Sequence, residues 1–130
     1  MILAGLVLGS VALAAADAAA AAKYDFEVVK TDEIYFGSGK HPKAPGVMAA
    51  DDVWAVIPEY KQILKDELTD EDPRYHILMR KATERFSKAL KKLAKRDTYD
   101  MLGETGSIKS LKKKKVPDVT KEMAKLVSRD

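Results

Sequence analysis

Side chains that could act as acids, bases or nucleophiles are present, but they do not form the arrangements that catalysis requires. His41 lies in a Pro-flanked loop and His76 near an expected helix start, and neither belongs to a His-Glu-x-x-His motif or a close His pair. The carboxylates at 51–52 and 70–72 lie at expected helix starts, where they can cap the free backbone N–H groups of the helix. The cluster at 70–72 also lacks the glycine and the closing glutamate of a calcium-binding loop. The chain has no cysteine, and no serine has the surroundings of a nucleophile. The sequence therefore predicts a protein that is not an enzyme and has no cofactor or metal.

Positive charge is the clearest chemical feature of the chain. Residues 74–96 carry nine basic side chains against one acid, Glu84, whereas residues 51–72 carry eight acids against Lys61 and Lys65. If the two segments form neighbouring helices, much of this charge is paired internally, and each exposed pair contributes only a few tenths to about 1 kcal/mol. The alternative is a docking surface for acidic polymers or anionic lipid headgroups, whose attraction weakens with salt. On that alternative the binding residues are Arg74, Arg80, Lys81, Arg85, Lys88, Lys91, Lys92 and Lys95.

Residues 1–22 have the composition of a secretory signal peptide. An apolar, uncharged run is followed by small residues, and Asp17 is the only charge in the segment. The apolar run is short and rich in Ala and Gly for a membrane span. No Lys or Arg precedes it, so a retained anchoring helix is the alternative to a cleaved signal. We expect an exported protein, with cleavage after Ala16, Ala20 or Ala22.

The first part of the mature chain predicts short strands followed by an interrupted helix. Residues 24–36 alternate partly between apolar and polar side chains, which indicates one or two edge strands. The Gly- and Pro-rich stretch 37–46 predicts a loop, so residues 23–46 are expected to form an N-terminal extension. A brief apolar strand at 47–50 leads into a helix that Pro58 kinks or restarts, because proline has no N–H to donate.

The second part of the chain predicts a long helix and a hairpin. Residues 74–96 contain no Gly or Pro, and Thr69 or Asp72 is expected to cap this helix. Its apolar stripe, at spacings of three and four, comprises Leu78, Ala82, Phe86, Ala89, Leu90 and Leu93. Residues 99–111 predict a β-hairpin, and residues 120–128 a short C-terminal helix after a basic loop. The fold class expected is therefore α+β.

This order of elements, with three short stretches, resembles the OmpH-like (Skp) family of periplasmic chaperones. The stretches are Ile57-Pro58-Glu59-Tyr60-Lys61, Ala94-Lys95-Arg96-Asp97-Thr98-Tyr99-Asp100-Met101-Leu102 and Val116-Pro117-Asp118-Val119-Thr120-Lys121-Glu122-Met123. They lie within residues 47–130, which form the domain that the resemblance covers. The family implies coiled-coil helical arms on a small β-sheet body, a periplasmic homotrimer, and a holdase that binds unfolded outer-membrane proteins, with anionic lipid or lipopolysaccharide as further partners. For this chain the expected fold is a short helical hairpin on a small β-sheet body with a short C-terminal helix.

Two departures from the family's pattern bear on that function. Only about 40 residues separate Pro58 from Asp97, so the coiled-coil arms that enclose a client in the family would be much shortened here. Thr98 stands where the family usually has glycine. The alternative function is therefore a structural or adaptor protein of the envelope that has kept the fold and lost holdase activity.

The expected oligomer follows from small size and from the aromatic side chains. Trp54, Tyr60, Phe86 and Tyr99 are expected in the core or in a subunit interface, because aromatics at helical spacing usually pack. Two helices and a hairpin bury little apolar surface alone, so we expect a homo-oligomer. The resemblance implies a trimer, and a dimer joined along the hairpin is the alternative. Nucleic acid is not an expected partner, because few aromatics accompany the basic side chains and an export signal separates the protein from DNA.

Overall fold

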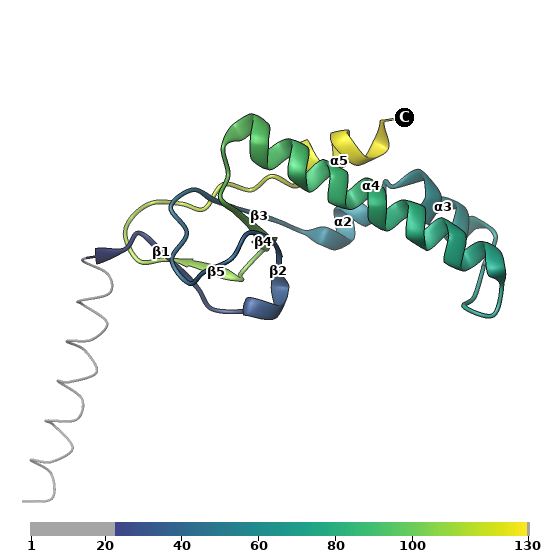
Figure 1. Cartoon of the computed structure of the whole chain (residues 1–130), viewed down its shortest axis with the longest axis horizontal. Coiled ribbons are helices and arrows are strands. Elements are labelled where there is room, and N and C mark those ends of the chain that lie inside the picture. Colours follow the sequence, from purple (N-terminus) through teal and green to yellow (C-terminus); the bar gives the residue numbers. More distant parts are fainter. Residues whose placement is uncertain (1–22, 130) are drawn as a thin grey trace, which may run out of the picture.

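The computed structural model describes residues 23–129, which form an α+β fold (Figure 1). The predicted signal peptide, residues 1–22, lies outside the described residues. The helices are α2 (Ala50–Trp54), α3 (Pro58–Lys65), α4 (Pro73–Asp97) and α5 (Thr120–Ser128). The strands are β1 (Phe26–Val28), β2 (Ile34–Phe36), β3 (Pro45–Met48), β4 (Met101–Glu104) and β5 (Ile108–Ser110), with a 3-10 turn η1 at Thr31–Glu33.

The strands form two small sheets. In the first, β4 is central, with β2 antiparallel on one side and β3 parallel on the other. In the second, β1 and β5 pair in antiparallel fashion, with Val28 opposite Ile108. The segment before α5 extends the first sheet, because the Val47 amide donates to the Pro117 carbonyl at 2.9 Å. Residues 23–46 therefore supply one strand to each sheet and the first two residues of β3.

The predicted hairpin of residues 99–111 is wrong. β4 and β5 are separate strands as expected, but they pair with different partners and belong to different sheets. After Gly106, whose φ is +88°, the buried Ser107 donates its hydroxyl to the Glu104 carbonyl at 2.6 Å. The Ser107 carbonyl accepts the Val29 amide at 2.9 Å. The first bond closes the turn after β4, and the second joins the chain to the residue that follows β1.

The strand expected at 47–50 begins two residues earlier, at Pro45, so the predicted loop is too long. The Asp100 carboxylate accepts the amides of Lys43 and Ala44 at 2.7 and 3.0 Å. These two bonds hold the chain that precedes Pro45 against the start of β4. Pro45 lacks an N–H, which an edge strand tolerates better than a central one.

The helix boundaries follow from local signals. α2 ends at Trp54 and α3 restarts at Pro58, as expected from the missing proline N–H. The Asp72 carboxylate accepts the Arg74 amide at 2.8 Å, so Asp72 rather than Thr69 caps α4. The 25 residues of α4 span roughly 37 Å. The helix ends at Thr98 in the left-handed conformation, with φ of +57°, which normally favours glycine.

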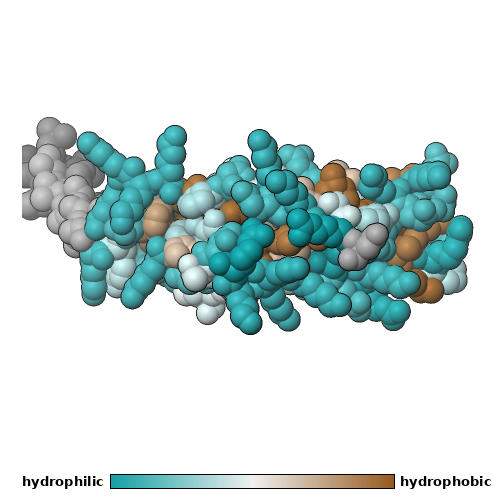
Figure 2. Space-filling model, turned by 90° about the horizontal axis from the view of Figure 1, so that it is seen from above, coloured by the Kyte–Doolittle hydropathy of each residue, from teal (hydrophilic) through white to brown (hydrophobic). Residues whose placement is uncertain are grey.

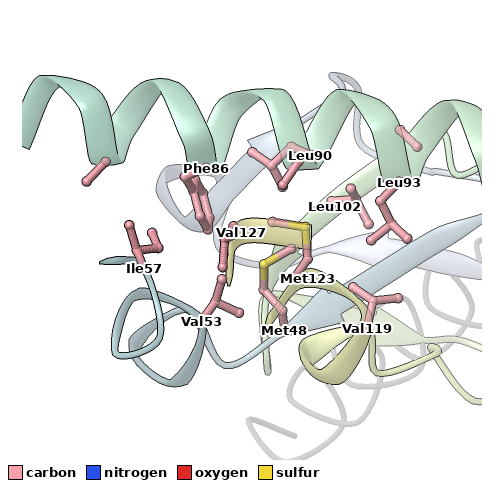
Figure 3. Close-up of a cluster of buried hydrophobic side chains, with 13 residues drawn as sticks. Met48, Val53, Ile57, Phe86, Leu90, Leu93, Leu102, Val119, Met123 and Val127 are labelled. Atoms are coloured by element: carbon pink, nitrogen blue, oxygen red, sulfur yellow. The ribbon is translucent and has the colours of Figure 1, made fainter. Parts of the chain in front are cut away.

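The main core lies beneath α4 and is closed by α2 and α5 (Figure 3). The predicted stripe of α4 is buried from Ala82 to Leu93, whereas Leu78 is half-buried. Facing it are apolar side chains of the other elements, namely Met48, Val53, Ile57, Leu102, Val119, Met123 and Val127. A second cluster, formed by Phe26, Val28, Val47, Met101 and Ile108, joins the two sheets. None of the helices within residues 23–129 is long and apolar enough to cross a membrane.

The four aromatic residues expected in a core or interface all pack on the main core. Phe86 is buried, and the half-buried Trp54 ring lies 5.6 Å from the rings of both Phe86 and Tyr60, measured between centroids. Tyr99 is half-buried beside Gly46, where an added Cβ would lie 3.2 Å from the Tyr99 ring. One chain is therefore enough to place all four in packed surroundings.

Candidate functional site

The described chain has an open groove beside α4, at the place where α3 and α5 pack on that helix; this is the α4–α5 groove. Its volume is about 520 Å³. Four cations of α4, at spacings of three and four residues, line it: Lys81, Arg85, Lys88 and Lys92. Arg129 and Leu126 complete the wall at the α5 end. Because residues at these spacings share one side of a helix, the basic side chains form a continuous row facing α5.

The groove has more positive than negative charge. Its lining holds five cations and two carboxylates, Glu59 and Glu84. Arg85 binds Glu59 with two hydrogen bonds of 2.7 and 2.9 Å, and it also donates to the Arg129 carbonyl. Within residues 23–129, Lys88 and Lys92 have no carboxylate within 4.0 Å. A negatively charged ligand would therefore meet lysines whose charge is not already neutralised.

The Glu59–Arg85 pair ties α3 to α4 at the wall of the groove. Both side chains are largely covered, with exposed fractions of 15% for Glu59 and 25% for Arg85. Hydrogen bonds from the Arg85 guanidinium hold the pKa of the Glu59 carboxyl below its usual range. Glu59 thus remains charged at neutral pH and orients Arg85 along the groove.

Glu59→Gln is expected to lower the free energy of unfolding by about 1–2 kcal/mol at pH 7, because Arg85 loses a charged partner. Since the pKa of Glu59 is lower in the folded than in the unfolded protein, its stabilisation is complete above the unfolded value of about 4.3 and is lost as pH falls through the folded value. Urea unfolding at pH 7 and pH 3 measures both effects. Glu84→Gln is the matched control, because Glu84 lines the same groove and has no ion pair within residues 23–129. A Glu59→Gln penalty equal at both pH values would contradict this role for the charge.

The structure brings together only part of the predicted basic surface. Lys81, Arg85, Lys88 and Lys92 line the groove, whereas Arg74 pairs with Asp72 at the start of α4, at 3.1 Å. The other predicted contacts, namely Arg80, Lys91 and Lys95, are exposed on α4 but do not line the groove. Sequence reasoning did not identify Glu59, Leu126 and Arg129 as groove residues. The spacing of the basic residues 81, 85, 88 and 92 indicates that they share one face of the helix.

The acids of residues 51–72 neutralise few of the basic side chains of α4. Within residues 23–129, Glu59–Arg85 is the one ion pair that joins an acid of 51–72 to α4 from another helix. Most acids of the 66–72 turn lie at the far end of α3, away from the lysines of the groove (Figure 1). The basic face of α4 therefore remains largely open to solvent.

Apolar side chains are also exposed near the turn between α3 and α4. Leu64 is 58% exposed and Ile77 is 47% exposed. Seen from the side of α4 and α5, the surface is mostly hydrophilic, with apolar side chains in separate patches (Figure 2). The α3–α4 region thus offers both cations and isolated apolar contacts to a partner.

The excess of cations in the groove is suited to binding anions. Among the residues that the structure describes, no group of three or more His, Asp or Glu side chains is placed to hold a metal ion. The groove instead gathers cations on one helix and apolar contacts nearby. Comparisons of the chain with protein-family models, with curated proteins and with solved structures found no match, so its function is inferred from its own residues.

Proposed function

We propose that this protein is an exported, non-catalytic holdase that binds unfolded outer-membrane or other envelope proteins along α4. The observation that carries the proposal is the excess of cations in the α4–α5 groove, where Lys88 and Lys92 have no carboxylate partner within residues 23–129. Acidic stretches of an unfolded chain would be attracted from a distance and held at the groove. Anionic lipid headgroups and lipopolysaccharide carry the same charge and would compete for it.

Apolar contacts would supply the part of the affinity that salt does not screen. Leu64 and Ile77 are exposed on α3 and α4. An unfolded client exposes apolar side chains together with charged ones, so it can engage both features at once. Removing apolar surface from water contributes about 25 cal/mol per Å², independent of the client's sequence.

The short hairpin of α3 and α4 restricts how a client can be held. α3 has eight residues and spans only about 12 Å. If α3 and α4 are the shortened arms of an OmpH-like chaperone, they are too short as a pair to enclose a client. We infer that the client lies along the groove beside α4, in the periplasm, and is not enclosed. A homotrimer would place three such grooves on one particle and raise the avidity for a long chain.

The short α3 also favours the second candidate, a non-catalytic structural or adaptor protein of the envelope. Such a protein would use the groove for one folded partner with a complementary acidic surface. It would show no general affinity for unfolded chains.

Aggregation of a diluted, unfolded outer-membrane protein separates the two candidates. We expect the protein to suppress aggregation at about 20 mM salt and to lose most of this effect at about 300 mM salt, because the screening length shortens. Light scattering with and without the protein measures this. Suppression that is equal at both salt concentrations would contradict the electrostatic mechanism. No suppression at either concentration would rule out the holdase and favour the adaptor.

A further inference from the structure

A second pocket lies at the C-terminal end of α4, where the chain leaves the helix and enters the first sheet. Its volume is about 410 Å³, within the range of small-ligand sites. It shares no lining residue with the α4–α5 groove. The segments that form it come from four places in the chain: β1, the loop before β3, the end of α4, and the basic loop before α5.

Apolar side chains form much of this second pocket. Phe26 and Pro45 are already covered by the rest of the protein, so the apolar surface open to a ligand comes from Ala44 and the half-buried Tyr99 ring. Pro117 contributes a further apolar edge. These rings cannot hydrogen-bond along their faces, so the surface favours the apolar part of a ligand.

Lysines surround this apolar surface. Three lysines, Lys43, Lys114 and Lys115, line the pocket, but only one carboxylate, Asp97, does so. Asp97 pairs with Arg96 at 3.2 Å. Lys114 pairs with Asp25 at 2.8 Å. Lys43 and Lys115 have no carboxylate within 4.0 Å among residues 23–129. The pocket therefore has two cations available for an anionic ligand.

The loops that carry these lysines are held in place. The Lys43 amide donates to the Asp100 carboxylate at 2.7 Å, so the backbone rather than the side chain of Lys43 is used to anchor the loop. In the basic loop, the ammonium groups of Lys112 and Lys114 form ion pairs with the Asp25 carboxylate, at 3.0 and 2.8 Å. A site whose loops are already ordered loses less entropy when a ligand binds.

The charged groups that act on the Tyr99 hydroxyl are Asp97, Glu122 and Arg96, not the lysines of the pocket. This hydroxyl has no hydrogen-bond partner among residues 23–129. Burial, together with the nearby Asp97 and Glu122 carboxylates, raises the pKa of this hydroxyl. Tyr99 can thus serve the apolar part of a ligand with its ring.

We propose that this pocket binds a small amphipathic carboxylate, a molecule with one carboxylate on an aliphatic chain. The aliphatic chain would lie against Ala44, Tyr99 and Pro117, and the carboxylate would lie near Lys43 and Lys115. A neutral or cationic molecule with the same chain would bind more weakly, because it cannot use the two lysines. This site is independent of the proposed holdase function.

Titration with octanoate, followed by amide NMR shifts, tests the proposal. We expect saturable shifts concentrated at residues 43–45, 97–99 and 114–117. Two probes of matched length, 1-octanol and octylammonium, should bind at least about tenfold more weakly. Equal binding of either probe, or shifts that avoid these three segments, would overturn the proposal.

A pair of charge-matched variants tests the role of the lysines. Lys43→Gln/Lys115→Gln is expected to weaken octanoate binding about tenfold, whereas Lys109→Gln/Lys113→Gln is expected to leave it unchanged. The control removes the same charge from lysines that are exposed and lie outside the pocket. Equal losses in the two variants would show that only net charge matters and would refute the site. Neither variant alters the α4–α5 groove, so aggregation suppression reports separately on the proposed function.

Discussion

Replacing Lys81, Lys88 and Lys92 with glutamate is expected to abolish client binding while the protein remains folded. All three side chains are exposed and line the groove, and none is part of the core. The substitution turns an excess of cations into an excess of carboxylates, so attraction of an acidic client becomes repulsion. We expect about a 100-fold loss of affinity at low salt, a loss that shrinks as salt screens the charges. Binding of a fluorescently labelled unfolded client, titrated at both salt concentrations, measures it.

The control for this variant comes from the same helix. Arg80, Lys91 and Lys95 are exposed on α4 but lie outside the groove. Replacing these three with glutamate changes the net charge by the same amount, so long-range steering is weakened equally. We expect a loss of less than about tenfold, because the groove keeps its lysines. If the two triple variants lose affinity equally, the whole basic face acts as one surface and the groove has no special role.

The long helix and its boundaries were predictable because their causes are local. The α4 stripe recurs every three or four residues, and Asp72 and Pro73 form a start signal that needs no distant partner. The restart at Pro58 follows from one missing N–H. Signals of this kind depend on neighbours within about one helical turn, so the sequence alone is sufficient.

Strand pairing was not predictable, because it depends on contacts between distant residues. β5 has three residues, too few for its pattern to specify a partner, and Val28 pairs with Ile108 across most of the described chain. The turn at 105–106 favours a hairpin locally. Contacts of the buried Ser107 with the chain after β1 override that preference.

The candidate groove was predictable only in its cations. Lys81, Arg85, Lys88 and Lys92 belong to a basic helix in any arrangement, and their spacing places them on one side of it. The side of α4 on which α5 packs is determined by the core, because Met123 and Val127 of α5 are buried there. The pairing of Glu59 with Arg85 likewise requires α3 to pack on α4, so neither feature could be assigned before the fold.

Leu93→Ala is expected to lower the free energy of unfolding by about 3 kcal/mol and the melting temperature by about 12 °C. Leu93 is fully buried on α4 and faces the core shared with α5 and the first sheet (Figure 3). Truncation loses apolar contacts and leaves a cavity that the surrounding helices can close only in part. Urea and thermal unfolding measure the change.

Leu64→Ala is the matched control, because it removes the same atoms from a side chain that is 58% exposed. We expect it to change stability by less than about 0.5 kcal/mol and to weaken client binding by several-fold at high salt, where apolar contacts dominate. Leu93→Ala should have the opposite profile, with reduced stability and unchanged affinity below its melting temperature. If Leu64→Ala destabilises the protein as much as Leu93→Ala does, Leu64 is covered by another copy of the chain and is not a client contact. The two leucines thus separate the surface that stabilises the fold from the surface that binds clients.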